Sequence, residues 1–150
     1  MKITPFQQKI PKPWGYELIL GSPNSSTTAK ILHINAGCRF SLQYHEIKEE
    51  TLVLIRGEAK IIYGSSENNL LEEPMEKERG YFIPKGLIHR CLAISDCDIF
   101  ESSTKEVGTT VRLQDDYQRG NESEEERQRM QSSKCPPAHD MQCRAGKVQS

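Results

Sequence analysis

The chain has no long apolar run, no excess of charge of either sign and no closely paired cysteines. No stretch approaches the roughly 20 apolar residues of a membrane span, and residues 1–15 contain no apolar region of a signal peptide. With 20 basic and 21 acidic side chains among 150 residues, no overall field favours nucleic acid or an anionic membrane. We therefore expect neither a nucleic-acid partner nor a membrane.

The cysteines are odd in number and contain no CxxC pair. Reduced thiols in a cytoplasmic protein are the simplest interpretation, so we expect a cytoplasmic location. The five residues are Cys38, Cys91, Cys97, Cys135 and Cys143.

Apolar residues are also scarce and unevenly distributed. They make up 35% of the chain, and the mean hydropathy of −0.66 is low for a compact domain. After Arg119 aliphatic side chains are few, so this end cannot bury enough surface to order itself, although residues 124–130 can form one or two helical turns. Three prolines within residues 1–13 indicate an extended arm. The predicted parts are an N-terminal arm (1–10), a folded domain (11–119) and a flexible tail (120–150).

What the middle of the chain does contain is many short β-type runs. They recur at roughly 8–12-residue intervals with turn residues between them, and no helical period is sustained in residues 14–113. This pattern predicts an all-β fold, a sandwich or a barrel. The predicted strands cover residues 14–20, 29–35, 40–45, 50–56, 59–64, 81–83, 90–94, 98–102 and 109–113.

Potential metal ligands gather in the segment between two glycines, residues 37–57. Some thirty residues later His89 follows a Pro-x-Gly turn and adds a further imidazole. Imidazole, amide and carboxylate ligands suit Zn, Fe, Ni or Mn, so the two segments predict a metal site on a β scaffold. The ligands of the first segment are Gln43, His45, Glu49 and Glu50.

The spacing of these residues resembles the two motifs of the cupin superfamily. The first motif, G-x5-H-x-H-x3,4-E-x6-G, is matched from Gly37 to Gly57, with Gln43 in the first His place. The second, G-x5-P-x-G-x2-H-x3-N, is matched by PKGLIH at residues 84–89, while its first Gly is displaced and Ala93 replaces the Asn. The resemblance implies a single cupin β-barrel, jelly-roll-like, with a divalent metal ion, zinc being the first expectation. Its implied metal ligands are Gln43, His45, Glu50 and His89.

Within that superfamily the chain resembles the type II mannose-6-phosphate isomerase domain. The matching segments are SLQYH (41–45), KPWGYE (12–17), IPKG (83–86) and VRLQDDYQR (111–119), in the same order along the chain. The resemblance covers residues 11–119 and implies interconversion of mannose 6-phosphate and fructose 6-phosphate in nucleotide-sugar and polysaccharide synthesis. The family pattern after the Gln, x-HHHRAEHW, is YHEIKEETL here, so the ligand positions are kept while two His positions and the Trp are not.

The resemblance also implies roles around the metal. A sugar phosphate needs cationic donors at the barrel mouth, and the candidates lie in or beside matching motifs. A base must move a proton between C1 and C2, and Glu49 and Glu101 both remain open for this role. The predicted substrate-binding residues are Arg39, Ser41, Arg90 and Arg119, and the predicted catalytic residues are Glu49, Glu101 and Lys85.

Two alternatives to the isomerase remain open. A non-catalytic cupin that binds a sugar or sugar phosphate fits the changed His positions. An oxygen-dependent metalloenzyme is less favoured, because that class prefers two His and one carboxylate on iron, and Gln43 stands in place of a His.

By analogy with other cupins, the N-terminal arm can add a strand to a second copy, so a homodimer is expected.

Overall fold

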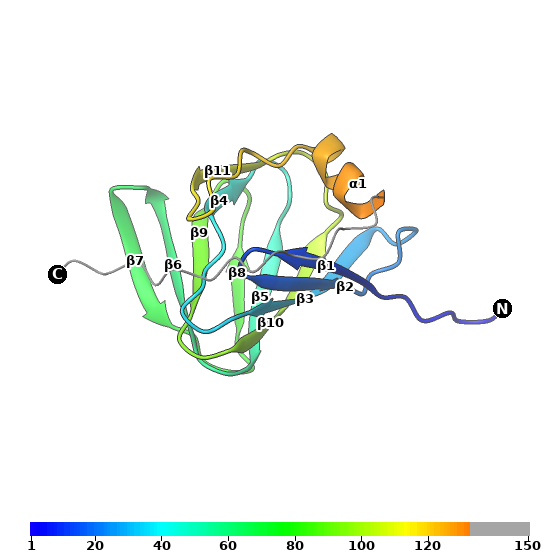
Figure 1. The fold of residues 1–150 in the computed structure, drawn as a ribbon, viewed down its shortest axis with the longest axis horizontal. Coiled ribbons are helices and arrows are strands. Elements are labelled where there is room, and N and C mark those ends of the chain that lie inside the picture. The colour runs from blue at the N-terminus through cyan, green and yellow to red at the C-terminus, as the bar shows by residue number, and fades with distance from the viewer. Residues whose placement is uncertain (133–150) are drawn as a thin grey trace.

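The computed structural model describes residues 1–132, and these confirm the all-β fold class (Figure 1). The strands are β1 (Gln8–Lys12), β2 (Gly15–Ile19), β3 (Thr27–Ile34), β4 (Leu42–His45), β5 (Glu50–Arg56), β6 (Ala59–Ser66), β7 (Asn69–Pro74), β8 (Gly80–Ile83), β9 (Ile88–Ala93), β10 (Cys97–Thr104) and β11 (Thr110–Gln114). A helix, α1 (Glu124–Ser132), follows them.

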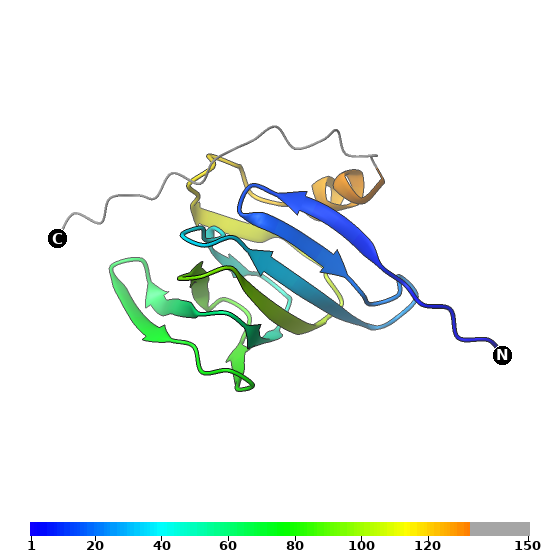
Figure 2. The ribbon, with the colours of Figure 1, turned by 60° about the horizontal axis from the view of Figure 1, so that its bottom comes forward.

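The strands form two antiparallel sheets that face each other across the core (Figure 2). One sheet has the order β1-β2-β3-β10-β5-β8, and the other has the order β11-β4-β9-β6-β7. Several neighbours, such as β3 and β10 or β4 and β9, come from distant parts of the chain, as in a jelly-roll barrel. The segments at residues 37–57 and 84–89 thereby reach the same interior.

Three neighbouring strands of the six-stranded sheet carry the same gradient of polarity on their buried faces. In the observed register Glu101 lies opposite Lys30 on β3, and Ser103 lies opposite Glu50 on β5. The interior therefore has an apolar end, which holds the core, and a charged end. From the charged to the apolar end, the buried residues are Lys30, Leu32 and Ile34 on β3, Ser103, Glu101 and Ile99 on β10, and Glu50, Leu52 and Leu54 on β5.

The glycine that ends the first motif is required by the turn between β5 and β6. Gly57 has φ +82°, and a Cβ at this position would lie 2.2 Å from the backbone oxygen of Asp96. Only a residue without a side chain fits here. Gly57 therefore allows the β5–β6 turn to pack closely against the β9–β10 connection.

Both predicted domain boundaries need correction. Residues 8–10 are extended, as expected of the arm, but they belong to the folded domain, because β1 pairs with β2 and buries Ile10. The tail does not begin at residue 120, since Glu122 bridges to Thr110 and α1 follows. Charge pairing explains the difference, because Glu122 and Arg127 are buried through ion pairs and not through apolar surface. The remainder of the predicted tail, residues 133–150, lies outside the described residues.

Cysteine chemistry matches the sequence expectation in part. Cys91 and Cys97 are free and buried, in line with the expectation of reduced thiols at these two residues. In residues 1–132 no helix has the length and apolar character needed to cross a membrane.

Candidate metal centre

Two imidazoles converge on one carboxylate oxygen at the charged end of the barrel. The Nε2 atoms of His45 and His89 lie 3.2 and 2.9 Å from Oε1 of Glu50. His45 ends β4, Glu50 begins β5 and His89 lies in β9, so both sheets contribute. The potential ligand atoms all lie within 4.8 Å of one another, and the three residues are buried. Such a group can hold a metal ion.

The hydrogen bonds behind the imidazoles fit a cation at this point. Nδ1 of His89 lies 2.9 Å from the carbonyl oxygen of Leu87, which can only accept, so Nδ1 carries the proton. In a neutral ring Nε2 is then an acceptor that faces another acceptor, Glu50 Oε1. A cation bound by both removes that conflict, and the backbone contact is a common way to orient a metal-bound histidine.

His45 is held in a similar way from the other side. Its Nδ1 lies 2.9 Å from the hydroxyl of Thr110 on β11. Burial, together with the positive charge of Lys48, lowers the pKa of His45 to about 4. The ring is therefore neutral at pH 7, which is the form that binds metals.

Gln43 lies beside this group but is already engaged. It pairs with His89 across β4 and β9 and lines the same cavity. Its Oε1 accepts a 2.6 Å hydrogen bond from the buried Ser41 hydroxyl. Since a carbonyl oxygen has a second lone pair, Gln43 can still donate to a metal, with Ser41 orienting it. Ser41 and Gln43 of the SLQYH segment therefore lie at the site, together with His45 of the same segment.

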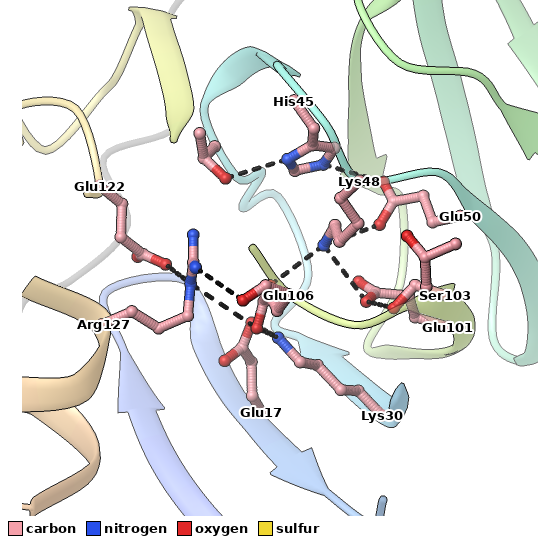
Figure 3. Close-up of polar contacts among 12 residues, drawn as sticks. Glu17, Lys30, His45, Lys48, Glu50, Glu101, Ser103, Glu106, Glu122 and Arg127 are labelled. Atoms are coloured by element: carbon pink, nitrogen blue, oxygen red, sulfur yellow. Dashed lines mark hydrogen bonds and ion pairs between the residues drawn. The ribbon is translucent and has the colours of Figure 1, made fainter. Parts of the chain in front are cut away.

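Lys48 is one of the residues at this site that the sequence interpretation missed. Its Nζ lies 3.2 Å from Glu50, 3.3 Å from Glu101 and 3.1 Å from Glu106 (Figure 3). Although burial opposes it, these carboxylates raise the pKa of Lys48, and Lys48 in turn holds the pKa of Glu50 well below its usual range. The sequence signal that could have found Lys48 is the alternation of side chains along an extended segment. Lys48 precedes Glu50 by two residues, so the two side chains point to the same face.

Of the two candidate bases, Glu101 lines the cavity and Glu49 does not. Burial raises the pKa of Glu101 to about 7, with Lys48 opposing the shift, and the Ser103 hydroxyl donates a 3.1 Å hydrogen bond to it. A carboxyl that titrates near neutral pH can both accept and return a proton. Glu49 is half-buried, and its backbone N–H donates to Thr104.

The predicted cationic residues are mostly placed elsewhere. Arg39 forms a two-pronged ion pair with Asp116, and Lys85 is exposed on the turn before β9. Arg90 donates to two backbone carbonyls, and burial lowers its pKa to about 10. Only Arg119, which is paired with Asp115, lines the cavity. The structure thus does not bring Arg39, Lys85 and Arg90 to the metal cup.

The cavity beside the cup is small and densely charged. It has a volume of about 50 Å³, enough for a metal ion or a few water molecules. Most of its charged side chains pair with one another, so burial is offset by opposite charge. Its charged lining residues are Lys12, Glu17, Lys48, Glu50, Glu101, Glu106, Arg112, Arg119 and Glu122.

Comparison with known proteins places the chain by family and by fold. The family described as mannose-6-phosphate isomerase C-terminal matches residues 2–116. No curated protein is similar enough in sequence to count as a match.

Among solved structures, the capsular polysaccharide assembling protein CapF from Staphylococcus aureus aligns with a TM-score of 0.55 and 14% identity, over 78% of this chain and 34% of its own. A deletion mutant of Bacillus subtilis oxalate decarboxylase aligns with a TM-score of 0.62 and 15% identity, over 75% of this chain and 32% of its own. The chain thus spans about a third of these proteins, and at such identity the likeness concerns the fold alone.

Proposed function

This chain is a cupin that belongs to the mannose-6-phosphate isomerase C-terminal family, and we propose that it is a metal-dependent sugar-phosphate isomerase that interconverts mannose 6-phosphate and fructose 6-phosphate. The observation that carries the proposal is the placement of a His-Glu-His group and the near-neutral carboxyl of Glu101 around one buried lysine. Such a reaction needs a cation near the sugar oxygens and a group that moves a proton between neighbouring carbons.

His45, Glu50 and His89 would hold the metal, with Gln43 as a further ligand. Two neutral imidazoles, a carboxylate and a carbonyl oxygen suit zinc, which we propose as the ion. A bound zinc ion supplies electrostatic stabilisation for charge that develops on the sugar oxygens. The carboxylate is prepared for this role because Lys48 occupies only its other oxygen, Oε2.

Glu101 is the proposed base. It would take the proton from C2 and return it to C1, and its pKa of about 7 allows both steps near neutral pH. Lys48 contacts both Glu101 and Glu50. It would keep Glu50 ionised at the metal, while Glu101 remains able to exchange a proton. Arg119 is the predicted phosphate-binding residue that lines the cavity.

The experiment is a coupled assay for fructose 6-phosphate on the purified chain loaded with Zn²⁺. Mannose 6-phosphate should be converted, and Glu101→Gln should reduce the rate at least about 100-fold, within the range of a general base. Glu49→Gln is the matched control and should retain the rate. No conversion by the metal-loaded wild-type chain would reject the proposal.

A second candidate, a non-catalytic cupin that binds a sugar or sugar phosphate, is favoured by the size of the cavity. A volume of about 50 Å³ is far below that of ordinary ligand pockets, so a hexose does not reach the cup in this conformation. Mannose 6-phosphate that binds tightly without any turnover, whichever metal is loaded, would support this candidate over the isomerase.

We further propose a homodimer and a cytoplasmic location. β1 lies at the edge of the six-stranded sheet, where it can pair with a second copy. Light scattering that returns the mass of a single chain would reject the dimer. Cell fractionation tests the location.

A further inference from the structure

One carboxylate at the barrel mouth is surrounded by three cations from separate parts of the chain. Glu122 Oε2 lies 3.0 Å from Arg112 and 3.8 Å from Lys12, and Oε1 lies 3.0 Å from Arg127. Burial alone would raise the pKa of Glu122, but these cations lower it. Figure 3 shows Arg127 pointing at Glu122 beside the Lys30–Glu106 pair. The residue is 9% exposed, so this is a nearly closed anion site.

Arg112 offers a donor that the carboxylate does not use, while Lys12 and Arg127 each also lie 3.7 Å from a second carboxylate, Glu17 and Glu106. The Nε–H of Arg112 is buried and has no hydrogen-bond partner among the described residues, although the rest of its guanidinium is engaged. An unused buried N–H costs free energy. A carboxylate has two oxygens, whereas a phosphate monoester has three that are free to accept. A phosphate in this place can therefore accept from Arg112 Nε as well.

Glu122 also stands where the inner cavity meets a larger groove. It lines the cavity of the metal cup and, with Arg112 and Arg119, a surface groove of about 540 Å³. Its backbone is anchored by paired hydrogen bonds to Thr110, each 3.0 Å. The side chain can consequently rotate into the groove while the backbone stays in place. Displacement of the carboxylate requires no unfolding.

We infer that Lys12, Arg112 and Arg127 form a phosphate-binding site that Glu122 occupies as an internal competitor when no ligand is bound. The inference rests on the proposed function in one respect, that the phosphate belongs to the sugar substrate. In this arrangement the phosphate replaces the Glu122 carboxylate, which opens the boundary between the groove and the cavity. The competitor belongs to residues 120–132, which follow the part of the chain matched by the family.

The test is calorimetric titration of the full-length chain, metal-free and Zn²⁺-loaded, with inorganic phosphate, mannose 6-phosphate and mannose. Glu122→Gln removes the competing charge and keeps the side-chain size, so it should tighten phosphate binding about tenfold, as expected when a competing state is removed. Arg112→Gln should weaken binding by a similar factor. Glu125→Gln, an equal charge change on an exposed residue of α1, should leave the affinity within about twofold.

Equal or weaker phosphate binding by a folded Glu122→Gln chain would overturn the inference. If that variant does not fold, Glu122→Asp is used, because its shorter side chain reaches the cations less well. Phosphate binding by the Glu122→Asp chain that is no tighter than in wild type would then overturn the inference. If inorganic phosphate binds as predicted and mannose 6-phosphate binds no more tightly, the phosphate site is supported. The proposed sugar-phosphate substrate is then rejected. These measurements need no turnover, so an inactive isomerase does not affect them.

Discussion

At the scale of single residues, the site depends on how Glu50 divides its two oxygens. Oε1 faces His45 and His89, while Oε2 faces Lys48. The lysine keeps the carboxylate ionised in a buried place, and the other oxygen remains available to a metal ion. A buried charge is tolerated only when it is paired, so Lys48 and Glu50 depend on each other.

Glu50→Gln should therefore lower the Zn²⁺ affinity at least about 100-fold, beyond the 10- to 100-fold that loss of a supporting residue costs. Competition with a chromophoric chelator measures this. Glu49→Gln, one residue away but outside the cavity, should change the affinity less than about twofold. Equal losses in the two variants would show that the effect is general electrostatics and not ligation.

Glu101 should make stability depend on pH in a predictable direction. Its pKa is about 7 in the folded chain and 4.5 ordinarily, so between these values the folded state holds a proton that the unfolded state has released. The free energy of unfolding should fall as the pH rises from 5 to 8, by up to about 3 kcal/mol from this group. Urea unfolding of the metal-free chain measures it, and an unchanged slope in Glu101→Gln would contradict the assignment.

The site residues divide into those that a motif predicts and those that only the fold brings near. His45, Glu50 and His89 were predictable because their spacing follows a known pattern. Arg112 and Glu122 were not, since no local pattern marks a cation that meets its partner across a bridge such as Thr110–Glu122. The motif-adjacent Arg39 was misplaced because its nearest carboxylate, Asp116, lies outside the cup.

At the scale of elements, the turn between β5 and β6, which joins the two sheets, helps to position Glu50 by fixing where β5 ends. Two glycines test this, since Gly57 and Gly86 share φ +82° but differ in their surroundings. Gly57→Ala should cost about 2–4 kcal/mol of unfolding free energy, because strain adds to a 2.2 Å overlap with Asp96. Gly86→Ala meets no atom within 4 Å and should cost about 1 kcal/mol, the strain alone. Equal costs in chemical denaturation would contradict the role of close packing.

The interior strands were predictable, and so were the edge strands β8 and β11, whereas the edge strands β1 and β7 were not. β5 was predicted at residues 50–56, as observed, because residues 51–55 form a short apolar, β-branched run. The prolines of residues 1–13 predict an extended arm without marking β1 as a strand, but an edge strand tolerates a proline such as Pro11. β7 is exposed along most of its length, so alternation never marked it. An edge strand that is exposed along most of its length, such as β7, therefore carries no alternation signal in the sequence.

At the scale of the whole molecule, a charge network joins the C-terminal segment to the barrel. Arg127 of α1 reaches Glu122 at 3.0 Å and Glu106 at 3.7 Å, and Glu106 contacts Lys48. Arg127→Gln should cost about 3 kcal/mol of unfolding free energy, since it leaves buried carboxylates short of a partner. Arg79→Gln removes an exposed arginine with a glutamate partner and should cost less than about 0.5 kcal/mol. Similar losses in thermal or urea unfolding would contradict the integration of α1.

The central claim is that the metal cup and Glu101 act together on a sugar phosphate. One measurement tests it most directly: metal content and mannose 6-phosphate turnover, determined on the same Zn²⁺-reconstituted preparation of wild type, Glu50→Gln and Glu101→Gln. We predict bound metal and turnover in wild type, loss of both in Glu50→Gln, and loss of turnover alone in Glu101→Gln. A wild-type chain that binds no metal, or turnover that survives in both variants, would contradict the claim.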